Sequence, residues 1–134
     1  MVEHLAKLYG FLLRRIAQAW KDLLAQWGVQ WSVVAEVQSS ASTVFIELCR
    51  HVPSSFVRTG KVPPGLKEMA VDLVQLYVQA LEASYAEWKK TGLDFTASQV
   101  KAGADNLFIQ LCRNYLDVVE DLPYQVRKEV EVEV

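Results

Sequence analysis

One short stretch of sequence occurs twice in this chain of 134 residues, and the repetition limits the folds that the chain can adopt. The first copy reads VFIELCR over residues 44–50, and the second reads LFIQLCR over residues 107–113. The two copies are 63 positions apart, measured from Phe45 to Phe108. A repeat of this period indicates a duplicated supersecondary unit. We therefore expect Phe45 and Phe108 to take equivalent core positions, where truncation of either to alanine would cost about 3–5 kcal/mol.

A second, looser match precedes each copy at a spacing of 61 positions, measured from Trp27 to Trp88. It also places Leu12 on Leu73, with apolar residues matching along the intervening sequence. Two matches in the same order and at nearly the same spacing predict a duplicated helical hairpin. The expected fold is all-α. Its two hairpins would form a four-helix bundle with approximate twofold symmetry, or open into a bundle shared with a neighbouring copy.

Composition and length indicate a globular chain of one domain. Hydrophobic residues make up 51% of the chain and charged residues 22%, which is a composition that can bury a core. We predict a single helical domain over residues 1–122, followed by an extended tail over residues 123–134. The domain is expected to consist of repeat unit 1 (about 4–52), a linker (53–65) and repeat unit 2 (about 65–122).

Four segments have apolar residues at intervals of three and four, which predicts amphipathic helices. The expected helices cover about residues 4–27, 32–52 and 65–90, and from Thr96 to just before Pro123. The first of them has an apolar arc broader than a surface helix needs. That helix is therefore expected either to be central in the bundle or to offer a second face to a partner.

Capping residues support the ends of these helices. Gly28 and Gly92 follow the first and third helices, where a left-handed residue commonly ends a helix. Ser32 is a candidate N-cap for the second helix. Thr96 and Gln99 have the spacing of a capping box at the start of the fourth.

The second helix is the weakest of the four predictions. Residues 39–43 read SSAST, and Ser, Thr and the nearby β-branched residues have poor helix propensity. The same small side chains would suit a close crossing of two helices. The better helical pattern of the second repeat favours a helix here.

The last segment has a different period. From Tyr124 onward apolar and charged residues alternate, which is typical of a strand with one buried face. A single strand in a helical chain has no partner within the chain, so we predict that the tail pairs with or docks on another copy, for instance on the broad apolar arc of its first helix. The alternative is a frayed end. The predicted contact residues of the tail are Val126, Val130, Val132 and Val134.

The chain contains four tryptophans. The simpler interpretation is that they fill the core and the helix junctions. The alternative is that some of them anchor an oligomer contact, because aromatic residues are common at the centres of interfaces. The candidates for such a contact are Trp20, Trp27 and Trp31.

Charge is unevenly distributed along the chain. The net charge is −2, but residues 1–61 carry seven basic and four acidic residues, whereas the remainder carries seven basic and twelve acidic residues. Lys7, Arg14 and Lys21 recur every seven residues, with Arg15 beside them, so they lie near one side of the first helix. We predict that this side contacts phosphate or an acidic protein surface. The alternative is an ordinary solvated face.

Catalytic and metal-binding patterns are missing from the sequence. We find no phosphate-binding Gly loop, nucleophile elbow, HExxH motif or zinc-type Cys spacing, and therefore expect no enzyme activity, cofactor or metal. The only cysteines, Cys49 and Cys112, occupy the same place in the two repeats. They are expected to be small buried residues, the alternative being a disulfide across the symmetry axis.

These observations favour a non-enzymatic structural or assembly protein that self-associates into a larger complex or filament. The alternative is a nucleic-acid-binding subunit or coat protein that uses the basic first repeat. An apolar-ligand or membrane-surface binder is a third possibility, and no small-molecule substrate is expected. No signal peptide or transmembrane segment is visible, so we expect a soluble protein, intracellular or within an assembled particle.

Overall fold

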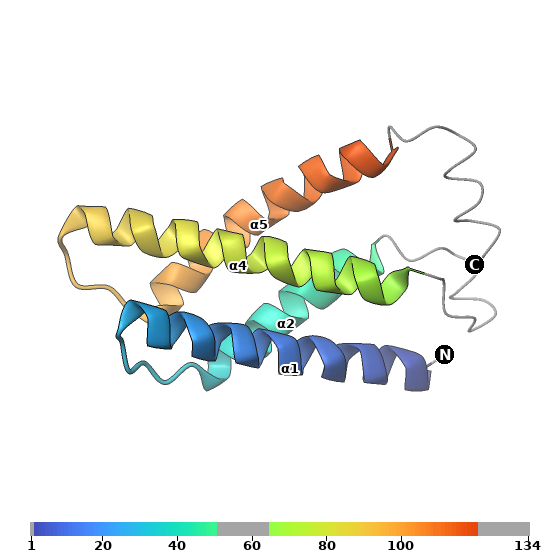
Figure 1. Ribbon diagram of the computed structural model, residues 1–134, viewed down its shortest axis with the longest axis horizontal. Coiled ribbons are helices and arrows are strands. Elements are labelled where there is room, and N and C mark those ends of the chain that lie inside the picture. The colour runs from blue at the N-terminus through green and yellow to red at the C-terminus, as the bar shows by residue number, and fades with distance from the viewer. Residues whose placement is uncertain (1, 51–64, 121–134) are drawn as a thin grey trace.

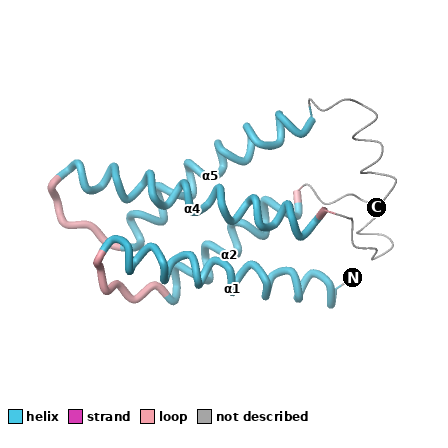
Figure 2. Tube along the Cα trace, viewed as in Figure 1, coloured by secondary structure: helices cyan, strands magenta, loops and turns pink. Residues whose placement is uncertain are grey.

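The computed structural model describes residues 2–50 and 65–120 (Figure 1). All regular secondary structure in these ranges is helical (Figure 2). The helices are α1 (Val2–Trp27), α2 (Val34–Cys49), α4 (Leu66–Thr91) and α5 (Ala97–Glu120). The prediction of an all-α bundle is confirmed, with helix ends within about three residues of those expected. Most of the predicted linker and the whole tail lie outside the described residues.

The four helices of the described ranges pack as two hairpins side by side (Figure 1). α1 and α4 contact each other and run in the same direction, and α2 and α5 contact each other and run the opposite way. α2 and α4 each pack against all three other helices. α4 lies between α1 and α5 in Figure 1, so α1 and α5 are on opposite sides of it.

Local sequence determines where the helices begin and end. At the start of α5 the Thr96 N–H donates to Gln99 Oε1 at 2.8 Å and the Gln99 N–H donates to Thr96 Oγ1 at 3.3 Å. This is the predicted capping box. Gly28 and Gly92 adopt left-handed conformations with φ of 71° and 69°, as expected of residues that end α1 and α4.

The predicted N-cap of α2 is wrong by one residue. Val33, not Ser32, precedes the first helical residue, and its side chain makes no capping hydrogen bond. The Val33 carbonyl accepts the Val37 N–H at 2.8 Å, which closes the first turn without a polar cap. Glu36 lies in that first turn, where its negative charge suits the helix dipole.

Small residues bring the helices close together in two places. In α2, Ser40 and Ala41 are fully buried. Between α4 and α5, the Ser84 hydroxyl donates to the Val100 carbonyl at 2.7 Å, and a Cβ built on Gly103 would clash with Ser84 Oγ. The run of small residues that weakened the helix prediction therefore lies at a packed crossing.

Two partly buried hydroxyl groups of α2 form hydrogen bonds within the helix itself. Ser42 Oγ donates to the Gln38 carbonyl at 3.1 Å, and Thr43 Oγ1 donates to the Ser39 carbonyl at 3.0 Å. Such bonds to the carbonyl four residues earlier satisfy Ser and Thr hydroxyls in a helix.

Matching positions of the two hairpins are buried alike in their first helices but not in their second helices. Leu12 and Ile16 of α1 are buried, and so are the matching Leu73 and Tyr77 of α4. The second helices of the two hairpins bury different positions of the motif. Val44 is buried in α2, whereas Phe108 is buried in α5.

The two phenylalanines of the repeated motif illustrate this difference. Phe108 is fully buried and packs edge-on against Tyr77, with ring centroids 5.1 Å apart. Phe45 is partly buried and contacts Tyr9 at the edge of the bundle, 5.5 Å between centroids. The burial of these two residues therefore does not match, although their positions in the motif do.

Candidate functional site

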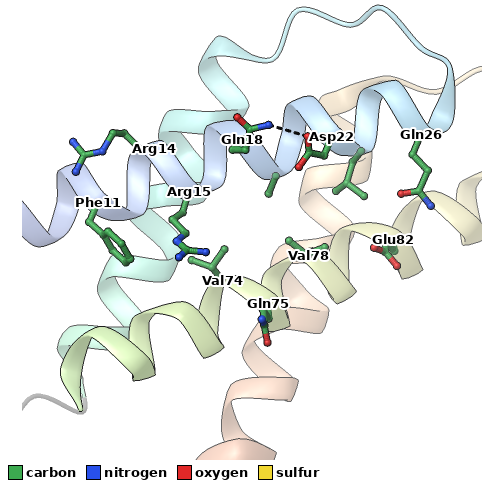
Figure 3. Close-up of a pocket in the computed structure, with 12 residues that line it drawn as sticks. Phe11, Arg14, Arg15, Gln18, Asp22, Gln26, Val74, Gln75, Val78 and Glu82 are labelled. Atoms are coloured by element: carbon green, nitrogen blue, oxygen red, sulfur yellow. Dashed lines mark hydrogen bonds between the residues drawn. The ribbon is translucent and has the colours of Figure 1, made fainter. Parts of the chain in front are cut away.

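An open groove of about 580 Å³ runs between α1 and α4 (Figure 3). The two helices run in the same direction, so equivalent turns of each face one another along its length. In Figure 3, Val74 and Val78 of α4 face α1 across the groove. Apolar side chains from both helices form its floor: Phe11, Ala19, Leu23, Val74 and Val78.

Charge is ordered along this groove. Arg15 lies near one end and Asp22 and Glu82 lie near the other (Figure 3). A smaller hollow of about 270 Å³ shares Phe11 and Arg15 with the groove and extends it to Lys67. Two carboxylates of α4, those of Glu68 and Asp72, also line this extension.

The ring of Phe11 organises the basic end. The Arg15 guanidinium and the Lys67 ammonium each lie 5.4 Å from the centroid of this ring. Contacts at this distance fall within the range of cation–π attraction, which contributes about 0.5–1 kcal/mol at an exposed site. One cation comes from α1 and the other from α4, so Phe11 brings both to one end of the groove.

The predicted basic residues of α1 do not all face one way. All four, Lys7, Arg14, Arg15 and Lys21, are exposed. In Figure 3 Arg15 extends toward the groove, whereas Arg14 extends away from it. Arg14 and Arg15 both line the groove, whereas Lys7 and Lys21 do not, and sequence periodicity alone does not separate the two pairs.

The tryptophans form the second sequence-predicted group, and the structure divides it. Trp20 is fully buried, and its indole N–H donates to Ser40 Oγ at 3.3 Å. In this fold Trp20 is a core residue, which agrees with the simpler interpretation of the tryptophans, and the alternative that it contacts another copy is corrected.

Trp27 and Trp31 lie in a ring cluster at the end of the bundle where the chain turns. The Trp27 ring stacks on Tyr85 at 4.0 Å, and Trp31 packs edge-on against Phe95 at 5.7 Å. The cluster joins the α1–α2 connection to the α4–α5 connection. Both tryptophans are partly buried, and their role in an oligomer contact stays a prediction. The four tail valines lie outside the described residues.

Sequence reasoning missed a polar network that crosses the core. Ser40 Oγ, which accepts from the indole of Trp20, lies 2.8 Å from the Tyr77 hydroxyl. Tyr77 donates to Asp105 Oδ1 at 2.6 Å, and Lys101 forms an ion pair with the same carboxylate. Each of the four helices in the described ranges contributes to this chain of contacts. Its only sequence signal is polar side chains at positions that the apolar pattern assigns to the core.

The environment of Tyr77 determines what this network can do. Burial, and then the hydrogen bond to Asp105, raise the pKa of the phenol far above its usual value of about 10. The phenol therefore stays protonated and donates to the carboxylate. Lys101 and Asp105 also line a hollow of about 330 Å³ between α2 and α5, but each neutralises the other there. This arrangement favours a structural role for the network over acid–base catalysis.

Both cysteines are free thiols. Cys112 is fully buried, and burial followed by the nearby Glu47 carboxylate raises its pKa to about 12. Burial also raises the pKa of Cys49, which is only partly buried. Glu47 is itself paired with Arg50, three residues later in the sequence, at 3.1 Å. The expectation of a small buried residue is met at Cys112, whereas Cys49 is only partly buried.

In the described part of the chain, no cluster of three or more His, Cys, Asp or Glu side chains is placed to bind a metal ion. No helix in residues 2–50 and 65–120 combines the length and apolar character needed to cross a membrane.

No protein-family model, no curated protein and no solved structure matches the chain.

Proposed function

We propose that this chain is a structural or assembly protein that self-associates, and that one copy binds another through the groove between α1 and α4. The observation that carries the proposal is the apolar floor of this groove, open along the two longest helices of the described ranges. Covering apolar surface is favourable by about 25 cal/mol per Å². Grooves between helices commonly bind a peptide segment whose apolar side chains point inward.

The shape of the groove favours a polypeptide occupant. Its lining extends from Phe11 to Gln26 on α1, and with the smaller hollow from Lys67 to Glu82 on α4. Each stretch covers fifteen residue steps, which is about 22 Å at 1.5 Å per residue in a helix. A long open groove of this kind encloses a compact small molecule on few sides, whereas an elongated chain can contact both helices along its whole length.

A charge on the groove floor should abolish self-association. We expect Val78→Glu to lower the mass measured by light scattering to that of a single chain, 15.2 kDa, because the carboxylate would lose water when the groove is covered. Gln79→Glu adds the same charge at an exposed position of the same helix and should leave the mass unchanged. Equal helical circular dichroism for both variants would verify folding. A wild-type chain that stays monomeric at every concentration would contradict the proposal.

We also infer that the two hairpins derive from one duplicated unit. The support is the repeated motif together with the matched burial of α1 and α4, where Leu12 and Leu73 take equivalent core positions. In this interpretation the second helices diverged after duplication. α2 became a central helix. In α5, Phe108 became the buried residue of the motif in place of Leu107.

Nucleic-acid binding is a second candidate, favoured by the exposure of Lys7, Arg14 and Lys21 on α1. If this side binds duplex DNA, each phosphate that it neutralises adds about 0.9 to the magnitude of the log–log salt slope. The double variant Arg14→Ala, Lys21→Ala should then reduce the magnitude of this salt slope by about 2. Arg113→Ala, exposed on α5, serves as the control.

The test of this second candidate is fluorescence anisotropy with labelled DNA and RNA over a range of salt concentrations. Absence of binding at low salt would refute it. So would an unchanged slope in the double variant. Light scattering of the wild type with and without nucleic acid separates it from self-association, because only a nucleic-acid subunit needs the added ligand to form the larger particle.

A further inference from the structure

We propose that the groove between α1 and α4 binds residues 124–134 of a second copy in an extended conformation. The inference deepens the self-association proposed above and rests on it. It combines the described groove with the sequence of a segment that lies outside the described residues. Three properties of the groove match that sequence: its apolar floor, its length and its order of charge.

The apolar faces match first. In an extended chain, successive side chains point to opposite sides, so Val126, Val130, Val132 and Val134 share one face. The opposite face carries Arg127 and three glutamates. The groove floor is apolar and its rims carry the long charged side chains of Arg15, Lys67 and Glu82. The valine face therefore fits the floor, and the charged face points to the rims and to water.

The segment is long enough for the groove. Ten steps separate Tyr124 from Val134, which is about 33 Å at 3.3 Å per residue in a strand, and the last seven of them, from Arg127, span about 23 Å. The groove measures about 22 Å along each helix at 1.5 Å per residue. The part of the segment from Arg127 onward therefore spans the whole groove without a bend.

The order of charge selects one direction. Lys128 shares the valine face, and in one direction it meets Asp22 and Glu82 at the acidic end. The glutamates that follow it then lie toward Arg15 and Lys67, which Phe11 brings together. Glu68 and Asp72 line the same end. The attraction for the glutamates therefore comes from the side chains of Arg15 and Lys67, which extend over the bound segment. The reversed direction would bring the glutamates of the segment to Asp22 and Glu82, where like charges meet.

The arrangement of the helices favours a second copy as the source of the segment. α5, which precedes the segment, packs on α2 and α4. α4 lies between α5 and the groove (Figure 1). A segment from the same chain would have to pass around α4, whereas a neighbouring copy can approach the open side of the groove directly.

A charge exchange tests the contact and its intermolecular nature together. One full-length variant carries Arg15→Glu and Lys67→Glu, and the other carries Glu131→Lys and Glu133→Lys. Each variant alone should have the mass of a single chain by light scattering, 15.2 kDa, because like charges meet. An equimolar mixture should recover the larger mass, because each groove then meets a segment of opposite charge. The control variant is Lys89→Glu, Lys90→Glu, which reverses two exposed charges of α4 outside the groove and should associate as the wild type does.

Other outcomes overturn either this inference alone or the proposed function with it. If the wild type associates and a variant lacking residues 124–134 associates equally, the segment is not the occupant, while self-association stands. If the two charge variants stay monomeric when mixed although the wild type associates, the intermolecular contact is overturned. A wild type that is monomeric at all concentrations removes both proposals. Circular dichroism of each variant verifies that the helices are retained.

Discussion

Replacing Phe108 by alanine should lower the free energy of unfolding by about 3–5 kcal/mol, because a fully buried ring leaves a cavity as well as losing its transfer free energy. Phe108 also contacts Tyr77, so the loss removes an edge-on aromatic pair. Phe45→Ala should cost clearly less, since Phe45 is only partly buried. The equal costs expected from the repeated motif alone are therefore not what the structure predicts.

Urea denaturation monitored by circular dichroism measures both values. The urea concentration at the midpoint of unfolding should fall, with little change in the m-value, if the variants unfold in one transition. Phe45→Ala serves as the matched control, because it makes the same substitution at the equivalent position of the repeat. A cost of less than about 1 kcal/mol at Phe108, small beside core truncations in general, would contradict the burial described for α5.

Tyr77→Phe should cost about 1–3 kcal/mol, because it leaves buried polar groups without their partner. The hydroxyl connects Ser40 of α2 to Asp105 of α5 across the core. Without it, the Asp105 carboxylate loses the hydrogen bond that Tyr77 donates. Ser40 Oγ then keeps only the hydrogen bond from the indole of Trp20, at 3.3 Å. Thermal or urea unfolding would measure the loss.

Tyr9→Phe provides the matched control. Its hydroxyl lies 3.2 Å from Ser42 Oγ in a part-buried position, so water can replace the lost contact. Spectrophotometric titration gives an independent check: the pKa of Tyr77 is raised, so its phenol should stay protonated in the folded protein above pH 10. Because the unfolded phenol ionises near pH 10, the stability that Tyr77 contributes is complete below that pH and declines as pH rises further. Equal unfolding costs for the two tyrosines would refute the network.

The sequence predicts this fold well where local chemistry decides the outcome. Thr96 and Gln99 form their capping box from side chains three residues apart, and Gly92 ends α4 by its own conformational freedom. Ser32 is a good cap in isolation, but α2 begins one residue later, after Val33, without a side-chain cap. Local propensity cannot report such a shift.

The candidate site depends on packing between hairpins, which sequence periodicity does not report. Spacing groups Arg15 with Lys7, Arg14 and Lys21, but only the position of α4 shows that Arg15 lines a groove. For Trp20 the sequence leaves both core filling and an oligomer contact open, and the bond to Ser40 on the next helix shows that it belongs to the core. In both cases the deciding residue lies on another helix.

The polar network through Tyr77 also bears on how the chain folds. Within the first hairpin Trp20 donates to Ser40, and within the second Tyr77 donates to Asp105. The contact between Ser40 Oγ and the Tyr77 hydroxyl joins the two hairpins. Both side chains are fully buried, so a misaligned docking of the hairpins would leave the Ser40 hydroxyl unmatched in a medium of low dielectric constant. This one contact therefore favours a single register of the two hairpins over the alternatives.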